Sequence, residues 1–169
     1  MVAIHMLTEA DAPVFRALRL RSLREHPEAF GASLEEEELL PVEHTAEHLR
    51  SSSPDRCILG AFVAGHLVGY AGFSRHPRPK TRHKAHLGGM YVVPEARGQR
   101  VGRALLDAVV THARSVSGVE EVVLAVTVGN ELARRLYILA GFKPYCIEPR
   151  YLKLEEQYFD IEWMVLLLD

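Results

Sequence analysis

The feature that most constrains the fold is a strand, a glycine-containing turn and a long helix that follow one another in the second half of the chain. The run at 85–93 is rich in β-forming residues, and the turn at 94–102 contains two glycines. From Val101 onward, apolar residues recur every three or four positions, which is typical of an amphipathic helix. A continuous β-branched run follows at 122–128, as in a strand covered on both faces. This order indicates an α/β fold.

Local patterns predict the remaining elements. They are a strand at 2–7, a helix from the N-cap Thr8 to about Pro27, a helix from Pro41 to Leu49, a hairpin of strands 57–63 and 67–74, a helix at 130–140 capped by Asn130, and two strands within 142–168. The first helix is expected to bury Val14, Ala17, Leu18 and Arg21 and to hold Arg16, Arg19 and Arg24 outside. Gly88 and Gly89 inside a strand predict a bulge.

Composition places the chain among ordinary globular domains. It has 169 residues, of which 48% are hydrophobic and 25% charged, and we expect one domain covering 1–169. The net charge of −2 argues against nucleic-acid binding, and no apolar run is long enough to span a membrane. The N-terminus resembles no signal peptide, so we expect a cytoplasmic protein. Cys57 and Cys146 have no metal-binding spacing.

The turn before the long helix is a candidate anion site. A helix N-terminus exposes up to four unpaired N–H groups, and small residues let an anion approach them. Arg97, Arg100 and Arg103 add positive charge around Gly98 and Gly102. The spacing fits neither a P-loop nor a dinucleotide fingerprint. Local sequence alone fits an exposed cationic turn equally well.

Two segments together resemble the GNAT superfamily of N-acetyltransferases. The turn resembles the motif Q/R-x-x-G-x-G/A, with Arg97 first, Gly102 last and Arg100 in place of the usual middle glycine. The second segment resembles N-x-x-A-x-x-L-Y-x-x-x-G-F, and its matching residues are Asn130, Ala133, Leu136, Tyr137, Gly141 and Phe142. The element order is also similar to that of the family along nearly the whole chain.

The resemblance implies a mixed, mostly antiparallel sheet flanked by helices, splayed near a strand that binds acetyl-CoA. It implies that the N–H groups from Gln99 to Ala104 hold the diphosphate and that Met90–Val92 pairs with the pantetheine arm. The cofactor-binding residues implied are Met90, Tyr91, Val92, Arg97, Gly98, Gln99, Arg100, Val101, Gly102, Arg103, Ala104, Asn130 and Ala133. No metal is expected, because His44-x-x-Glu47-His48 is an isolated match to a zinc motif with no third ligand.

By the same resemblance, the reaction is transfer of an acetyl group to a primary amine by direct attack. Tyr137 would protonate the leaving thiolate, although it also fits a core aromatic residue. His86 occupies the position of a base, and a water chain serves equally well. The acceptor is expected to be a small-molecule or peptide amine that meets Tyr137 in a groove beside Glu28 and Phe30. The alternatives are a non-catalytic acyl-CoA sensor and an enzyme for another phosphate ligand such as a nucleotide. The final strand could form part of a homodimer contact or pack in the core, and its sequence favours the core.

Overall fold

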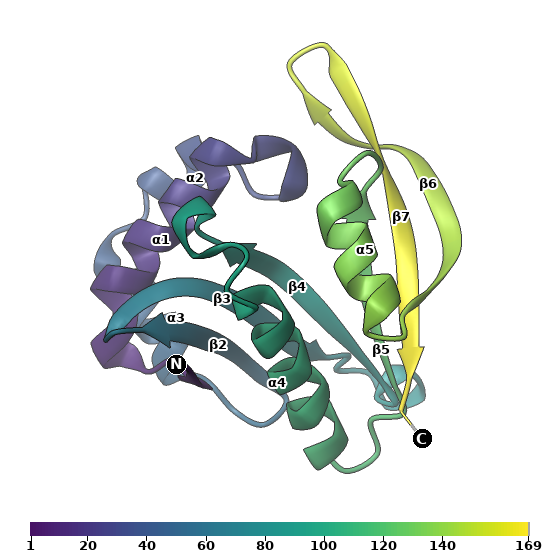
Figure 1. Cartoon of the computed structure of the whole chain (residues 1–169), viewed down its shortest axis with the longest axis horizontal. Coiled ribbons are helices and arrows are strands. Elements are labelled where there is room, and N and C mark those ends of the chain that lie inside the picture. The colour runs from purple at the N-terminus through teal and green to yellow at the C-terminus, as the bar shows by residue number, and fades with distance from the viewer. Residues whose placement is uncertain (169) are drawn as a thin grey trace.

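The computed structural model describes residues 1–168, in which seven strands form one sheet in the order β1-β2-β3-β4-β5-β7-β6 (Figure 1). Neighbouring strands are antiparallel except β4 and β5, which are parallel. The strands are β1 Val2–Met6, β2 Arg56–Val63, β3 His66–Arg75, β4 Lys84–Val92, β5 Glu121–Thr127, β6 Lys143–Leu154 and β7 Gln157–Leu167. The expected mixed, mostly antiparallel sheet is confirmed.

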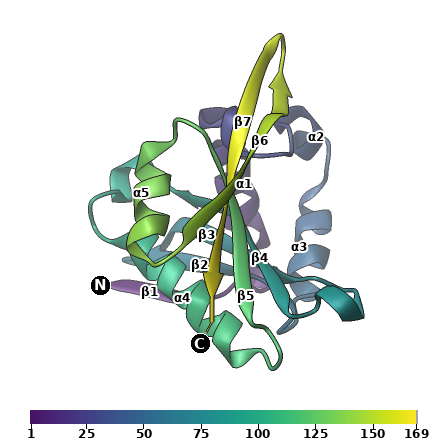
Figure 2. The same ribbon diagram turned by 90° about the vertical axis from the view of Figure 1, so that its right-hand side faces the viewer.

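Helices cover both faces of this sheet. They are α1 Ala12–Glu25, α2 Leu34–Glu38, α3 Val42–Arg50, α4 Val101–Ser115 and α5 Glu131–Leu139. Short 3-10 turns occupy Glu9–Asp11, Pro27–Ala29, Pro79–Thr81 and Pro94–Ala96. Figure 2 shows α4 and α5 on one side of the sheet and α2 and α3 on the other. No helix within residues 1–168 has the length and apolarity needed to cross a membrane.

Much of the core lies between α4 and the sheet, and α1 and α3 add Phe15, Leu23 and Leu49 to the same cluster. Leu105, Leu106, Val109 and Val122 are completely buried, and so is Met164 on β7. Burial of such side chains contributes roughly 1.5–3 kcal/mol each. The final strand is therefore partly core, as favoured from the sequence, although Leu167 is 63% exposed.

The prediction for the inner face of α1 was right for Leu18, which is buried, and wrong for Val14 and Arg21. Phe15 and Ser22 are buried in their place, and Val14 is 52% exposed. These two buried positions are one residue further along the chain than expected. This rotation brings Arg19 inward, with only 19% of its side chain exposed, whereas the sequence pattern predicts it outside.

The acidic run after residue 34 forms the short helix α2, which the sequence analysis missed. Ser33 caps it, because its hydroxyl accepts from the Glu36 N–H (3.2 Å) and its own N–H donates to the Glu36 carboxylate (3.0 Å). This is a capping box, and the S-x-x-E pattern was a usable signal for it. The helix lies against α1 and places Glu37 beside Arg19.

The sheet is splayed between β4 and β5. The two strands pair only where Lys84–His86 meets Glu121–Val123, and they separate beyond that point (Figure 1). The segment Leu87–Val92 of β4 therefore has β3 as a neighbour on one side and no paired strand on the other. Its main chain on that side is left open to a ligand.

Candidate active site

A cavity of about 790 Å³ occupies the space beside this splay. Its size is within the ~300–1,000 Å³ typical of ligand sites. Of the residues predicted from the sequence, those that line it are Met90, Tyr91, Val92, Arg97, Gly98, Arg100, Val101, Gly102, Arg103, Asn130, Ala133 and Tyr137. Glu28 and Phe30 line it too, so the expected groove beside Tyr137 is present. Gln99, Ala104 and His86 are not among its lining residues.

The N-terminus of α4 presents unbonded N–H groups to this cavity. Within residues 1–168, the N–H groups from Gln99 to Arg103 have no hydrogen-bond acceptor. The Ala104 N–H already donates to the Arg100 carbonyl oxygen (3.0 Å), so the set of free donors ends one residue earlier than expected. The turn needs left-handed backbone at Gly98 (φ +79°) and at Arg100 (φ +62°). The second value explains why glycine is usual at that position.

Two of the three arginines around the turn are used within the protein. Arg97 donates to the Val92 carbonyl oxygen (3.3 Å) and lies 3.2 Å from a ring nitrogen of His26. Arg103 donates to Asp107 (2.8 Å) and to the Leu139 carbonyl oxygen (3.2 Å), which ties α4 to the end of α5. Arg100 has no partner in the part of the chain that the structure describes. Its guanidinium is therefore the one best placed to move toward an anion.

The expected bulge is present in β4. Tyr70 faces Tyr91 and Gly72 faces Gly88, so one residue of β3 lies opposite two residues of β4, Gly89 and Met90. Gly89 adopts φ +63°, which a residue with a side chain rarely tolerates. The Tyr91 hydroxyl donates to Glu25, which is not among the residues that line the cavity. The bulge thus turns the main chain around Met90 toward the open side of the sheet.

Helix α5 carries the other side of the cavity. The Asn130 side chain accepts from the Ala133 N–H (3.2 Å), which confirms the cap. Two turns later the Tyr137 ring is 7% exposed and packs near Phe142 (6.0 Å between centroids). Its hydroxyl lies 3.9 Å from the Met90 sulfur atom. Tyr137 is therefore a core residue whose hydroxyl reaches β4, and burial raises its pKa to about 12.

His86 lies in an adjoining cavity of about 250 Å³. This second cavity shares Phe30, Met90, Asn130 and Tyr137 with the first, so the two meet at the Tyr137 side chain. The His86 ring lies 6.3 Å from the Trp163 ring. Burial lowers the pKa of His86 below its ordinary 6.5, and the nearby charge of His76 lowers it further. His86 is consequently neutral at pH 7 and able to accept a proton.

Comparison with known proteins assigns this arrangement to a family. A sequence model described as "Acetyltransferase (GNAT) family" matches residues 17–142, about three quarters of the chain. The chain belongs to the GNAT acetyltransferase family. The match covers α4 and α5 with the cavity between them.

Individual proteins are similar to the chain in sequence or in fold. The N-alpha-acetyltransferase RimI of Mycobacterium tuberculosis is 38% identical over 104 residues, which are 61% of this chain and 62% of RimI. A GNAT acetyltransferase structure from Streptococcus pneumoniae superposes with a TM-score of 0.90 at 22% identity, over 100% of both chains. The structure of yncA from Salmonella typhimurium, with its cofactor acetyl-CoA, has a TM-score of 0.86 at 20% identity, over 100% of this chain and 95% of that one. The chain spans only 25–62% of the length of several curated relatives.

Sequence reasoning missed several residues that lie around His86. Arg19, Tyr151 and Trp163 line the smaller cavity together with His86. They come from α1, β6 and β7, and no local motif connects them. Within residues 1–168, no three His, Cys, Asp or Glu side chains are grouped to hold a metal ion.

Proposed function

We propose that the protein transfers an acetyl group from acetyl-CoA to a primary amine by direct attack of the amine. One observation carries this proposal: the unbonded N–H groups of α4, the open edge of β4 and the Tyr137 hydroxyl all border the same cavity. A diphosphate, an extended amide-containing arm and a thioester need these three kinds of group, in this order along the ligand.

The residues fit acetyl-CoA on chemical grounds. The free N–H groups from Gln99 to Arg103 lie at the positive end of the α4 dipole, which favours a diphosphate. The unpaired edge of Met90–Val92 suits the amide groups of pantetheine in the manner of an added strand. The relative from Salmonella typhimurium, which has the same fold, contains acetyl-CoA. We therefore assign to this role the predicted cofactor residues that line the cavity, which leaves out Gln99 and Ala104.

Acetyl-CoA would supply the acetyl group as a thioester, from which a thiolate leaves when the amine nitrogen attacks the carbonyl carbon. A main-chain N–H of β4 near Met90 donates to the carbonyl oxygen as negative charge develops there. His86 accepts a proton from the acceptor ammonium, directly or through a water molecule. The Tyr137 hydroxyl donates a hydrogen bond to the departing sulfur atom, and the second proton that the nitrogen loses as the amide forms converts the thiolate into the free thiol of CoA.

The two cysteines support direct attack over a covalent acyl-enzyme. Neither Cys57 nor Cys146 lines the cavity that holds Tyr137. Cys57 is buried, and desolvation raises the pKa of its thiol to about 11. The thiolate needed for nucleophilic attack is therefore scarce at neutral pH.

The decisive experiment measures free thiol release from acetyl-CoA with a panel of small amines and short peptides. We expect CoA to bind and some amine to accelerate thiol release. CoA binding without thiol release for any amine would instead support the acyl-CoA sensor. Calorimetric titration with CoA, ATP and ADP tests the other alternative, which tighter binding of a nucleotide than of CoA would favour. A cytoplasmic location, a single domain and a homodimer stay predictions.

A further inference from the structure

Resting on the proposed function, we propose that Arg19 is a specificity-determining residue that binds a carboxylate of the acceptor. The preferred acceptors are then small amines that carry a carboxylate close to the nitrogen, of which α-amino acids are the simplest. The argument comes from the position of Arg19, its unused N–H groups and the charges around it.

Arg19 lies beside the reaction centre. It lines the cavity of about 250 Å³ that also holds His86, Met90 and Tyr137. A Cβ atom built on Gly89 would lie 3.7 Å from Nη1 of Arg19, so the bulge of β4 passes directly beside the guanidinium. Met90 is the next residue, and consecutive Cα atoms are about 3.8 Å apart. An anion on Arg19 would therefore lie within one or two residue lengths of the open edge of β4, as the carboxylate and nitrogen of an amino acid require.

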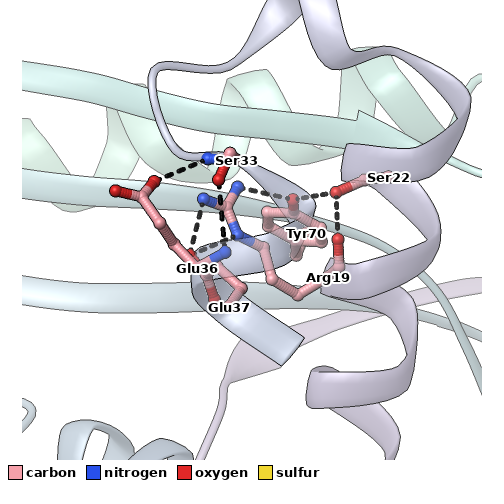
Figure 3. Close-up of polar contacts among 6 residues, drawn as sticks. All are labelled: Arg19, Ser22, Ser33, Glu36, Glu37 and Tyr70. Atoms are coloured by element: carbon pink, nitrogen blue, oxygen red, sulfur yellow. Dashed lines mark hydrogen bonds and ion pairs between the residues drawn. The ribbon is translucent and has the colours of Figure 1, made fainter. Parts of the chain in front are cut away.

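The guanidinium is held in place by its neighbours (Figure 3). Its Nε and Nη2 donate to one oxygen of Glu37 (3.3 and 3.1 Å), and its Nη1 donates to the Tyr70 hydroxyl (3.2 Å). The Tyr70 hydroxyl is itself bonded to the Ser22 hydroxyl (2.7 Å). The Phe30 ring lies 5.1 Å from Cζ of Arg19. A binding group fixed in this way loses little entropy when it takes up a ligand.

These contacts leave two N–H groups of Arg19 unused. A guanidinium has five N–H donors, and the bonds to Glu37 and Tyr70 use three of them. Nη1 and Nη2 each keep one N–H without an acceptor within residues 1–168. Two N–H groups on the two terminal nitrogens match the two oxygens of a carboxylate.

The charges nearby also favour an anion. A further cavity of about 290 Å³ adjoins Arg19, His86 and Gly89 and is lined by Arg16 and Arg56. Arg16 donates to the main-chain oxygens of residues 38 and 40, and Arg56 lies 3.4 Å from a ring nitrogen of His48. In the described part of the chain, neither arginine has a carboxylate partner. Among the residues that line this cavity, Glu37 is the single carboxylate and faces three arginines, so positive charge is in excess.

The size and lining of the acceptor cavity limit the rest of the molecule. About 250 Å³ is just below the ~300–1,000 Å³ of sites for drug-sized ligands. Phe30, Trp163 and Tyr151 supply aromatic surface on its walls. We therefore expect an apolar amino acid to be accepted better than a polyamine, because none of the residues that line this cavity is a carboxylate that could bind a second ammonium group.

The test compares acceptors that differ only in the carboxylate. The kcat/KM values of L-leucine, L-methionine and L-phenylalanine are divided by those of their carboxamides, in wild type, Arg19→Met and Arg19→Lys. Dividing each ratio by the wild-type ratio removes the difference in amine pKa between acid and amide. Arg24→Met is the matched control, because Arg24 is on the same helix, pairs with Glu38 and lines none of the three cavities described above.

We expect Arg19→Met to lower the acid-to-amide ratio about tenfold to a hundredfold, mainly through the KM of the acid. Arg24→Met should leave the ratio unchanged. Arg19→Lys keeps the charge and the ion pair but not the paired N–H groups, so it should lower the ratio by less. If thermal unfolding and CoA affinity show that Arg19→Met does not fold, the acid-to-amide ratio of Arg19→Lys tests the inference. An unchanged ratio in a folded Arg19 variant would overturn the inference.

Failure of this inference can be told apart from failure of the proposed function. Acetylation of other amines with no amino acid accepted would overturn the carboxylate site and leave the acetyltransferase proposal standing. If no amine releases thiol, calorimetry of the CoA-loaded protein with N-acetyl-L-leucine and its carboxamide decides. Preferential binding of the acid that Arg19→Met abolishes supports the site, and equal or no binding refutes it.

Discussion

Replacement of Tyr137 by phenylalanine separates the structural role of this residue from its chemical role. The ring packs in the core, and phenylalanine keeps that packing. The hydroxyl contacts the Met90 sulfur atom at 3.9 Å, and thioether sulfur is a weak acceptor. We therefore expect the free energy of unfolding to change by less than ~1 kcal/mol.

The expected loss of activity follows from the pKa of Tyr137. Burial raises it to about 12, whereas a thiol has a pKa of about 8.5, so complete proton transfer to the thiolate is unfavourable by ~5 kcal/mol. The hydroxyl then acts mainly as a hydrogen-bond donor to the developing charge. Removal of such a donor lowers kcat by about 10²–10³-fold, and we expect Tyr137→Phe to lower kcat by about 10²-fold.

The assay is thiol release at saturating acetyl-CoA, with Tyr158→Phe as the matched control. Tyr158 lies on the exposed β6–β7 hairpin and lines none of the cavities described above. Because a raised pKa keeps the phenol protonated, Tyr137 should cause no loss of activity between pH 8 and 10. Full activity in Tyr137→Phe would refute its role. An alkaline loss near pH 9 that disappears in this variant would refute the argument from burial.

Three further predictions concern His86, Gly102 and Arg100. Because the pKa of His86 is lowered, kcat/KM should rise with pH through a value below 6.5, and His86→Gln should abolish this rise; a rise that persists in the variant excludes His86 as the base. The same lowered pKa means that stability is lost as the pH falls through it, less so in the variant, as urea unfolding at pH 5 and 7 would measure. Gly102→Ala adds a Cβ at 3.4 Å from Leu136 and 3.6 Å from Met90. The free energy of unfolding should stay the same or rise by up to ~1 kcal/mol, whereas CoA affinity measured by calorimetry should fall about tenfold. An unaltered affinity would contradict diphosphate binding at the N-terminus of α4. Arg100→Gly should raise the free energy of unfolding by ~0.5–1 kcal/mol because it relieves a left-handed backbone, whereas Arg100→Gln should not; equal stability of the two would contradict the strain.

The structure of the proposed cofactor side was largely predictable because its features are local. The Asn130 cap, the glycine turn and the bulge at Gly89 each depend on a few consecutive residues. Their chemistry belongs to the main chain, which the neighbouring sequence controls directly. The limit of this local reasoning is visible at Arg97 and Arg103, whose side chains bond within the protein instead of facing the cavity as free charges.

The proposed acceptor side was not predictable, because it consists of side chains from distant elements. Arg19, Glu37 and Tyr70 come from α1, α2 and β3, and 51 residues separate Arg19 from Tyr70. Their meeting depends on the rotation of α1, which a weakly amphipathic sequence left uncertain by one position. A rotation of that size, about 100° on a helix, decides whether Arg19 faces solvent or the bulge of β4. In the proposed function, tertiary packing therefore determines which acceptor is selected, while local sequence determines how acetyl-CoA is held.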